Sequence, residues 1–362
     1  MSDSAEDTVR RLLSTWIDPW LELDWIQSGC LQQCDVKGTE VELEIHLPYP
    51  CATLVGDLVR AVQDLLEEHG LSSRVHIQSR ISRSRVRSGL AGMETVRNII
   101  AVASGKGGVG KSTTALEMAY ALQREGARVG ILDADIYGPS LPLLTGIPAG
   151  TRPGMHGDKE MLPFVQHGLQ LMSLGWLTDE QTPVIWRGPM ATGALIQMLS
   201  QTHWQDLDYL LIDMPPGTGD IALTLAQKIP VSGAVVVSTP QDLARIDAVR
   251  AIEMFRKVDI PVLGVVENMS VHICSQCGHH ESIFGEGAAD QLARDYQVGI
   301  LERLPLDGRI RAAADKGMSP VQQAKSMADI LGLYRNLAVR MAVALARQEQ
   351  LSEQRIPNLV MN

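Results

Sequence analysis

A ten-residue segment, Ser104–Thr113, constrains the fold of this chain more than any other feature. It reads SGKGGVGKST, it follows the apolar run Ile99–Ala103, and a helical pattern of apolar residues comes after it. Glycines at this spacing let the backbone curl so that its N–H groups point at phosphate oxygens. A chance match in a glycine-rich turn is the competing interpretation, but the motif G-x-x-x-x-G-K-[ST] stands here between a strand and a helix, as phosphate binding requires. We therefore expect a nucleotide-binding loop made of Gly105, Lys106, Gly107, Gly108, Val109, Gly110, Lys111, Ser112 and Thr113.

The motif also assigns roles to two of its side chains. Lys111 is expected to reach the β- and γ-phosphates of the nucleotide, and the hydroxyl of Ser112 is expected to bind Mg²⁺. The predicted chemistry is therefore binding and hydrolysis of a nucleoside triphosphate, with Lys111 as one of the catalytic residues.

Aspartates follow two further apolar runs of the chain. Asp133 and Asp135 come after Val129–Leu132, and Asp213 comes after Tyr209–Ile212. A strand-ending aspartate is, on its own, more often a cap or turn residue. In a parallel sheet, however, the carboxyl ends of the strands meet at one edge, so we expect these carboxylates beside the phosphate loop. The position of Asp213 predicts a ligand of Mg²⁺.

Buried strands and helices alternate through the rest of the chain. Near-continuous apolar runs are typical of strands that helices cover on both faces, and helical patterns such as Thr114–Glu125 and Ala191–Thr202 lie between them. The alternation predicts the α/β class for residues 97–350, with a doubly wound, mostly parallel sheet. The expected strands are Ile99–Ala103, Val129–Leu132, Leu169–Leu174, Tyr209–Ile212, Ala234–Val237 and Val262–Val266.

A small α/β domain is expected over residues 1–85, ahead of a linker at 86–96. Its pattern contains a helix around 9–17, an alternating strand over 41–47, a second helix over 54–66 and a strand around 75–77. Arginines and serines between residues 80 and 92 mark the boundary. A basic groove for an acidic partner is the alternative, and a solvated linker is favoured because runs of charge are mostly solvated.

Cys274 and Cys277 form a C-x-x-C pair just past the last expected strand, in a loop rich in glycine and histidine. Three interpretations compete. A thioredoxin-type redox pair normally opens a helix. Half of a zinc site would be completed by a neighbouring histidine. Half of an iron–sulfur site would supply two of the four cysteines that a cluster takes, and a two-fold dimer would bring the other two.

Composition excludes several classes of protein. The chain has 362 residues, enough for two domains, and 32 Lys and Arg against 42 Asp and Glu give a net charge of −10, which disfavours nucleic-acid binding. Five cysteines argue against a disulfide scaffold and for a reducing, cytoplasmic location. Cys30 and Cys34 are expected as small buried side chains, with metal binding as the alternative, and Cys51 has no assigned role. No apolar run reaches the length of a membrane span, and the N-terminal residues lack the pattern of a signal peptide.

Seven segments together carry a resemblance to a known family. They are GKGGVGKST, LDADIYGPS, WRGPM, DMPPGTGD, TPQD, ENMS and CSQCGHH. In this order they are similar to the Mrp/ApbC family of iron–sulfur cluster carrier ATPases, which are MinD-type P-loop NTPases, over roughly residues 97–340. The segment before residue 85 resembles the small MIP-type iron–sulfur assembly domain.

This resemblance implies a role for the remaining site residues. Lys106, the extra lysine of the loop, would reach the phosphates of the partner's nucleotide across a homodimer interface. Asp135 would position or activate the attacking water, and Asp133 would support the Mg²⁺ shell. Asn268, at the end of a strand, would hydrogen-bond the adenine.

The implied function is that of an ATP-dependent carrier. Cys274 and Cys277 of two copies would share one [4Fe–4S] cluster, with ATP and Mg²⁺ as cofactors. Assembly scaffold proteins and recipient apoproteins are the implied partners, and neither nucleic acid nor a membrane is expected. Two alternatives are a MinD/ParA-like positioning ATPase on membrane or DNA, and a zinc-stabilised regulatory protein. Against the first, the segment 337–351 is expected to be a packing helix.

Overall fold

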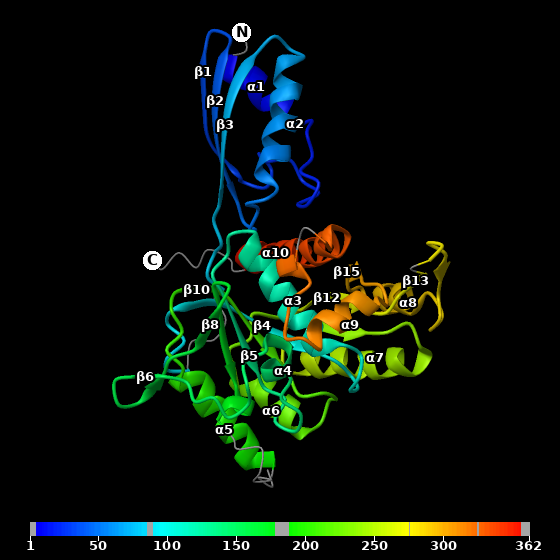
Figure 1. The fold of residues 1–362 in the computed structure, drawn as a ribbon. Coiled ribbons are helices and arrows are strands. Elements are labelled where there is room, and N and C mark those ends of the chain that lie inside the picture. The colour runs from blue at the N-terminus through cyan, green and yellow to red at the C-terminus, as the bar shows by residue number, and fades with distance from the viewer. Residues whose placement is uncertain (1–4, 85–89, 178–187, 275, 324–325, 356–362) are drawn as a thin grey trace. The chain divides into compact units, whose positions relative to one another are not determined.

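The structure is a computed structural model that describes residues 5–84, 90–177, 188–274, 276–323 and 326–355 (Figure 1). The chain divides into two compact units, Met1–Ser82 with Arg124–Gly126, and Arg83–Gln123 with Ala127–Asn362. Within the expected linker, Leu90 and Met93 pack against the core of the second unit. The domain ends at 85 and 97 stay a prediction.

The first unit consists of a helix, two strands, a helix and a third strand. Its sheet has the order β1-β2-β3, with β1 antiparallel and β3 parallel to β2. Buried side chains alternate along β2, as the sequence pattern predicts. The sequence does not predict β1, because LQQCDVK has no apolar alternation, so its pairing with β2 decides its conformation. The elements are α1 (Ala5–Leu13), β1 (Leu31–Lys37), β2 (Glu40–Leu47), α2 (Val55–Glu67) and β3 (Ser72–Ser79).

The first helix ends earlier than the sequence pattern predicts. It stops at Leu13, so Trp16 and Ile17 lie outside it, although both have helical spacing. The hydroxyls of Ser14 and Thr15 donate to backbone carbonyls three residues earlier, each at 2.7 Å. Such side-chain bonds to the backbone compete with continuation of a helix.

The second unit contains an eight-stranded sheet in the order β15-β12-β11-β4-β10-β5-β9-β8. Its strands are parallel except β8, which is antiparallel to β9. All six predicted strands belong to this sheet, which confirms the doubly wound α/β class. The strands are β4 (Val96–Ala103), β5 (Val129–Asp133), β8 (Phe164–Gln166), β9 (Leu169–Ser173), β10 (Leu207–Asp213), β11 (Gly233–Ser238), β12 (Val262–Glu267) and β15 (Ile300–Arg303).

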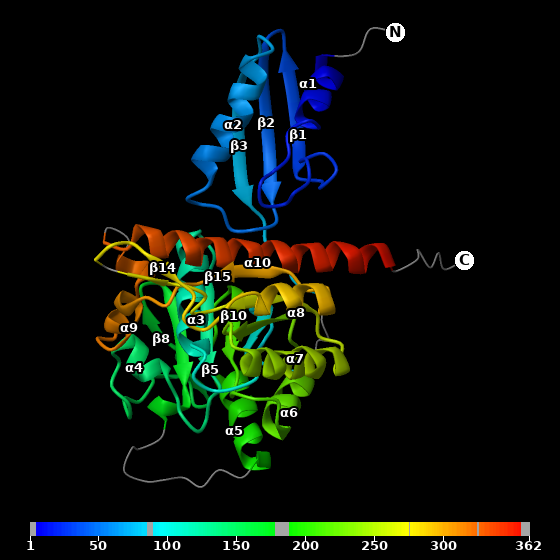
Figure 2. The ribbon, with the colours of Figure 1, turned by 90° about the vertical axis from the view of Figure 1, so that its right-hand side faces the viewer.

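Helices cover both faces of this sheet (Figure 2). The core of one face joins side chains of β4, β10 and β11 to those of α5, α6 and α7, and α3 and α10 lie on the opposite face. Leu337, Ala338 and Met341 of α10 are buried, which confirms the packing helix. The helices are α3 (Lys111–Arg124), α4 (Leu141–Thr145), α5 (Gly188–Gln201), α6 (Asp220–Lys228), α7 (Asp242–Lys257), α8 (Ala288–Tyr296), α9 (Gly308–Ala314) and α10 (Ala328–Arg355), with short 3₁₀ turns at Leu174–Trp176 and Val321–Gln323.

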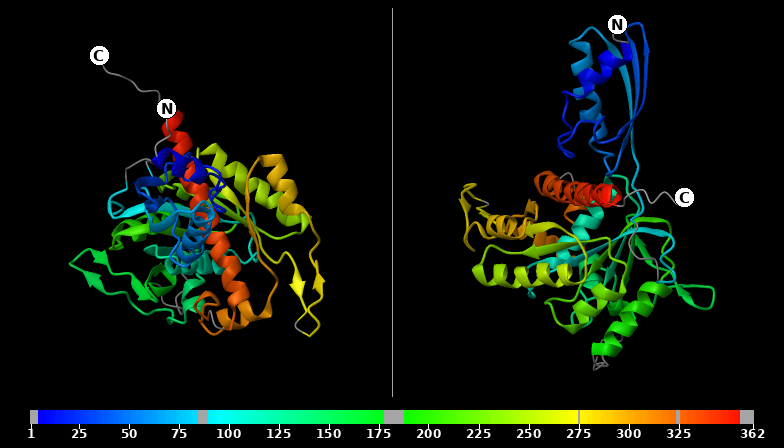
Figure 3. Two further views of the ribbon diagram at one scale, coloured as in Figure 1. Left: turned by 90° about the horizontal axis from the view of Figure 1, so that it is seen from above. Right: turned by 180° about the vertical axis from the view of Figure 1, so that it is seen from behind.

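Two small hairpins lie at opposite edges of the sheet (Figure 3). One pairs β6 (Met155–His156) with β7 (Glu160–Met161) and precedes the edge strand β8. The other pairs β13 (His272–Ile273) with β14 (His280–Glu281) and follows β12, next to the other edge strand. In the described part of the chain, no helix combines the length and the apolar character that a membrane crossing demands.

Candidate functional site

The phosphate loop connects the end of β4 to the first turn of α3. Gly108 and Gly110 both have a φ of 80°, a left-handed conformation that favours glycine. The hydroxyl of Ser104 donates to the carbonyl of Lys106 at 2.8 Å, and the N–H of Gly217 donates to the carbonyl of Ser104 at 2.9 Å. The loop thus receives a bond from the turn after β10, which the sequence motif does not indicate.

Close packing requires glycine at two positions of the loop, and at Gly110 the left-handed φ requires it as well. A Cβ atom on Gly105 would collide with the backbone of Asp247 in α7. A Cβ atom on Gly110 would collide with the side-chain amide of Asn268. A Cβ atom on Gly107 would meet nothing. Gly105 and Gly110 are therefore needed for the packing of the loop, whereas Gly107 faces open space.

Lys111 and Asp213 form a buried ion pair at the base of the loop. The Lys111 side chain is 6% exposed and that of Asp213 is fully buried. Lys111 Nζ also lies 3.4 Å from the hydroxyl of Ser112. Among the described residues, the second carboxylate oxygen of Asp213 finds no hydrogen-bond partner. A buried oxygen without a partner carries a desolvation cost that a bound cation relieves, so Asp213 and Ser112 fit the expected Mg²⁺ site.

Asp133 pairs with Asp213 in the register of β5 and β10, which places both carboxylates at one edge of the sheet. One Asp133 oxygen accepts from the N–H of Asp135 at 3.1 Å. The other accepts from the N–H groups of Ser140 and Leu141 at 2.8 and 3.0 Å, and from a serine hydroxyl at 3.1 Å. Burial and the neighbouring Asp213 raise the pKa of Asp133. Its contacts make Asp133 the side chain that shapes the 134–141 loop, and its expected support of a Mg²⁺ shell stays a prediction.

Asp135 differs from Asp133 in its surroundings. It is only partly buried, and desolvation raises the pKa of its carboxyl, while the nearby Lys111 lowers it. A carboxylate with a raised pKa and access to solvent is suited to accept a proton from water. Sequence reasoning missed Ser173, the serine whose hydroxyl reaches Asp133, because nothing in the spacing of the chain relates β9 to β5.

Asn268 connects the end of β12 to the phosphate loop. Its side-chain N–H₂ donates to the carbonyl of Val109 at 2.9 Å, and its side-chain oxygen accepts from the N–H of Met269 at 2.9 Å. Met269 adopts a φ of 57°. Asn268 thus holds the loop in this structure, and its contact with an adenine stays a prediction.

The cysteine pair lies on the β13–β14 hairpin. Cys274 is partly exposed and Cys277 is exposed. The N–H of Gly278 donates to the carbonyl of Cys274 at 2.8 Å, which closes the turn. Hydrogen bonds to the Cys274 sulfur, first from the backbone of Gln276, then from the backbone and the thiol of Cys277, lower its pKa. The two sulfurs are therefore close together, accessible and suited to hold a soft metal as thiolates.

The other three cysteines have the opposite character. Cys30, Cys34 and Cys51 are buried and free, and all belong to the first unit. Burial raises the pKa of each thiol, that of Cys51 to about 11. These thiols stay protonated near neutral pH, and the burial of Cys30 and Cys34 agrees with the prediction made for them. Of the WRGPM segment, Trp186 and Arg187 lie outside the described residues.

Comparison with known proteins decides the family. Residues 95–342 match a family model described as the NUBPL iron-transfer P-loop NTPase. The chain belongs to this family. Residues 6–77 match a second model, described as an iron–sulfur cluster assembly protein. The resemblance carried by the seven segments is therefore confirmed, and so is that of the segment before residue 85 to an iron–sulfur assembly domain.

Individual relatives agree with this membership. An iron–sulfur cluster carrier protein from Pseudomonas fragi is 58% identical over 268 residues, which cover 74% of this chain and 93% of that protein. One from Haemophilus influenzae is 48% identical over 319 residues, covering 88% and 86%. A solved nucleotide-binding protein from Archaeoglobus fulgidus, in complex with ADP, has a TM-score of 0.56 at 38% identity, and the match covers 62% of this chain and 88% of that chain. These likenesses confirm the P-loop NTPase fold of the second unit.

Proposed function

We propose that this chain is an ATP-hydrolysing carrier of [4Fe–4S] clusters. One observation carries the proposal: Cys274 and Cys277 stand close together on an accessible hairpin, and the pKa of Cys274 is lowered. Thiolates are the ligands that bind the iron of a cluster, and a cluster takes four of them. One chain offers two at this motif, so two copies hold one cluster between them as cargo.

The phosphate loop supplies the ATP site. When ATP binds, the Lys111 ammonium exchanges the Asp213 carboxylate for the β- and γ-phosphates, as in P-loop NTPases generally. This leaves the Asp213 carboxylate and the Ser112 hydroxyl facing the place where Mg²⁺ is expected. When bound, Mg²⁺ supplies positive charge that neutralises the phosphates.

Hydrolysis is assigned to Asp135 and Lys106. Asp135 accepts a proton from the attacking water, a role that its partly buried carboxyl with a raised pKa supports. Lys106 is partly exposed at the turn of the loop, where its ammonium is free to reach the nucleotide of a second copy. A cation from the partner would stabilise the charge that develops on the transferred phosphoryl group.

A short path connects the nucleotide site to the cysteines. Asn268 holds the Val109 carbonyl of the loop, and the chain runs directly from Asn268 through Ser270 to β13 and Cys274. Movement of the loop on ATP binding or hydrolysis would therefore shift the hairpin and change how tightly two cysteine pairs hold a cluster. Scaffold proteins that load the cluster and apoproteins that accept it are the proposed partners, in the reducing cytoplasm.

Anaerobic reconstitution tests the cysteine assignment. The parent protein should bind four iron and four acid-labile sulfide ions per two chains, the stoichiometry of a shared [4Fe–4S] cluster. Cys274→Ala should lose the cluster and keep its affinity for ATP, because the hairpin lies outside the phosphate loop. The matched control, Cys34→Ala, removes a buried thiol and should retain the cluster. A reconstituted parent without acid-labile sulfide, or full cluster content in Cys274→Ala, would refute the proposal.

A further inference from the structure

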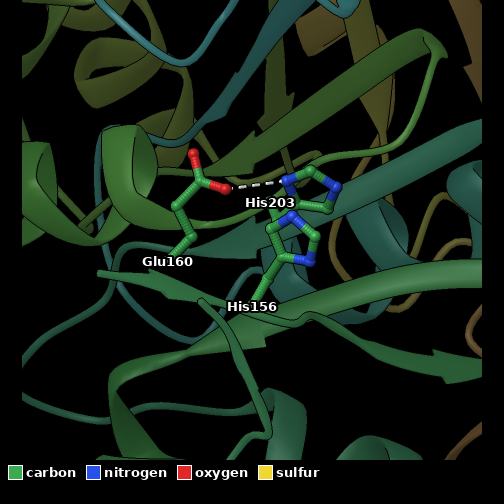
Figure 4. Close-up of side chains that lie close together, drawn as sticks. All are labelled: His156, Glu160 and His203. Carbon is green, nitrogen blue, oxygen red and sulfur yellow. Dashed lines mark hydrogen bonds and ion pairs between the residues drawn. The ribbon is translucent and has the colours of Figure 1, made fainter. Parts of the chain in front are cut away.

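A cluster of metal-ligating side chains lies at the edge of the sheet opposite the cysteines. It consists of His156, Glu160 and His203, which come from the β6–β7 hairpin and from the segment between α5 and β10 (Figure 4). One ligand atom from each of the three lies within 4.8 Å of the others. We propose that these residues form a binding site for a divalent transition-metal ion of the zinc type.

The ligand set has the composition of known zinc sites. Two imidazoles and one carboxylate, with a water in the fourth position, bind zinc in many proteins at about 2.0–2.2 Å per ligand. Ligand atoms of a tetrahedral site are then about 3.3 Å apart. Side-chain rotations must therefore shorten the observed spacing, in which the ligand atoms lie within 4.8 Å of one another. One pair is already closer than this, since Nδ1 of His203 lies at a hydrogen-bond distance of 2.9 Å from a carboxylate oxygen of Glu160.

The backbone holds the three side chains on one side. His156 and Glu160 are direct cross-strand partners in the β6–β7 hairpin. The N–H of His203 donates to the carbonyl of Met161 at 2.8 Å, which fastens the third ligand to the same hairpin. Backbone hydrogen bonds thus bring the three residues together.

The two imidazoles must turn relative to each other to bind a shared ion, because the lone pair of each ring nitrogen lies in the plane of its ring. The imidazoles of His156 and His203 are stacked, with centroids 4.0 Å apart and planes inclined by 20° (Figure 4). His156 is exposed, and Glu160 and His203 are partly exposed, so an ion has access from solvent. The competing account is an ion pair between Glu160 and His203 that only anchors the hairpin. That account requires nothing of His156, which makes His156 the residue that discriminates between the two.

Cobalt titration of the full-length chain tests the site. The background carries Cys274→Ala and Cys277→Ala, so that thiolates do not compete, and nucleotide is absent. We expect one equivalent of Co²⁺ with visible d–d bands and no sulfur-to-metal charge-transfer band, and displacement of Co²⁺ by Zn²⁺. His156→Asn leaves the Glu160–His203 pair in place and should weaken Co²⁺ binding by about 100-fold or more, and His203→Asn should do the same.

A matched control uses two histidines at the other edge of the sheet. The double variant His279→Ala and His280→Ala, in the same background, should bind Co²⁺ as tightly as its parent. Zn²⁺ should also raise the melting temperature of the background protein and not that of His156→Asn, because only a bound native state is stabilised by a ligand. Undiminished Co²⁺ binding by His156→Asn, or its loss in the His279/His280 variant, would overturn the site. Neither result would affect the cluster-carrier proposal, because the two sites lie at opposite edges of the sheet.

Discussion

Glu117 is a single residue whose environment has a measurable consequence for stability. It lies in α3, directly behind the phosphate loop, and is 2% exposed. One of its carboxylate oxygens accepts from the hydroxyl of Ser319 at 2.6 Å and from the N–H of Val321 at 3.0 Å. Burial raises the pKa of Glu117 to about 7, although these hydrogen bonds oppose the shift. The Glu117 carboxyl therefore connects α3 to the segment before α10, and its contribution to the free energy of unfolding depends on pH.

The sign of this dependence follows from the raised pKa. The folded state holds the Glu117 proton up to about pH 7, while the unfolded chain releases it near 4.5. The contribution of Glu117 to stability is thus complete below pH 4.5 and is lost as the pH rises through 7. Glu117→Gln removes the titration, so between pH 4.5 and 8 its stability relative to the parent should rise by about 1–3 kcal/mol. Unfolding curves of both proteins at several pH values measure this, with Glu253→Gln as an exposed control, and parallel pH profiles would contradict it.

At the scale of elements, the phosphate loop is positioned by its neighbours as much as by its own glycines. α7 lies against Gly105, and the end of β12 supplies Asn268, which covers Gly110 and holds the Val109 carbonyl. The turn after β10 donates to the carbonyl of Ser104. Three elements distant in sequence thus determine the conformation of one loop.

Glycine substitutions should reveal this positioning. Gly105→Ala places a methyl group against the backbone of Asp247, which has no room to yield, and should destabilise the protein by about 1–3 kcal/mol. It should also abolish ATP binding, because the loop must move away from its phosphate-binding conformation. Gly107→Ala faces open space and should melt within a degree or two of the parent. Thermal unfolding and ATP titration measure both effects, and equal destabilisation by the two substitutions would show that α7 does not constrain the loop.

The segment from β12 to β13 should transmit the state of the nucleotide. Asn268→Ala removes the bond to the Val109 carbonyl and leaves every side chain of the phosphate loop and both cysteines present. We expect this variant to bind a cluster, and to bind ATP more weakly than the parent, while a saturating concentration of ATP no longer changes the rate of cluster loss to an iron chelator. Ser270→Ala, which removes a bond to Leu304 from the same segment, is the control and should keep the ATP effect. A parent-like response in Asn268→Ala would place the coupling elsewhere.

At the scale of the whole molecule, the proposed function depends on how many copies of the chain act together. The phosphate loop presents Lys106, and the hairpin presents two cysteines where a cluster takes four. On the proposed function, each feature would be incomplete in one chain and complete in two. The proposed dimer would therefore be required twice, once for hydrolysis and once for cargo binding.

Size measurement by light scattering tests this requirement. A non-hydrolysable ATP analogue should shift the parent from one copy to two, and Lys106→Ala should reduce this shift because a cross-interface contact with the phosphates is lost. Lys257→Ala, which removes an exposed lysine of α7, should dimerise as the parent does. ATP hydrolysis by Lys106→Ala should fall in proportion to the lost dimer. A fully dimeric Lys106→Ala would refute the proposed role of this lysine.

Much of the fold and of the candidate site can be predicted from local patterns in the sequence. The strands of the second unit are visible because strands covered on both faces must be apolar along their whole length, as in β4 and β10. The phosphate loop is visible because its conformation needs glycines at fixed spacing, and the cysteine pair because its ligands are only three residues apart. Strand β1 cannot be predicted from its own residues, because its pairing with β2 determines its conformation. The end of α1 cannot be predicted either, because hydrogen bonds from local hydroxyl groups determine it.

By itself, then, the sequence determined the fold class, the family and the motif residues from Gly105 to Cys277, because each depends on residues that are close along the chain. Only the tertiary structure decided three contacts of the site. Asp213 forms an ion pair with Lys111, Asp133 accepts hydrogen bonds from the 134–141 loop, and Asn268 donates to the Val109 carbonyl. It alone brought His203 to His156 and Glu160. The reason is physical: these contacts join residues from different strands and loops, and only the packing and register of the sheet bring such residues together.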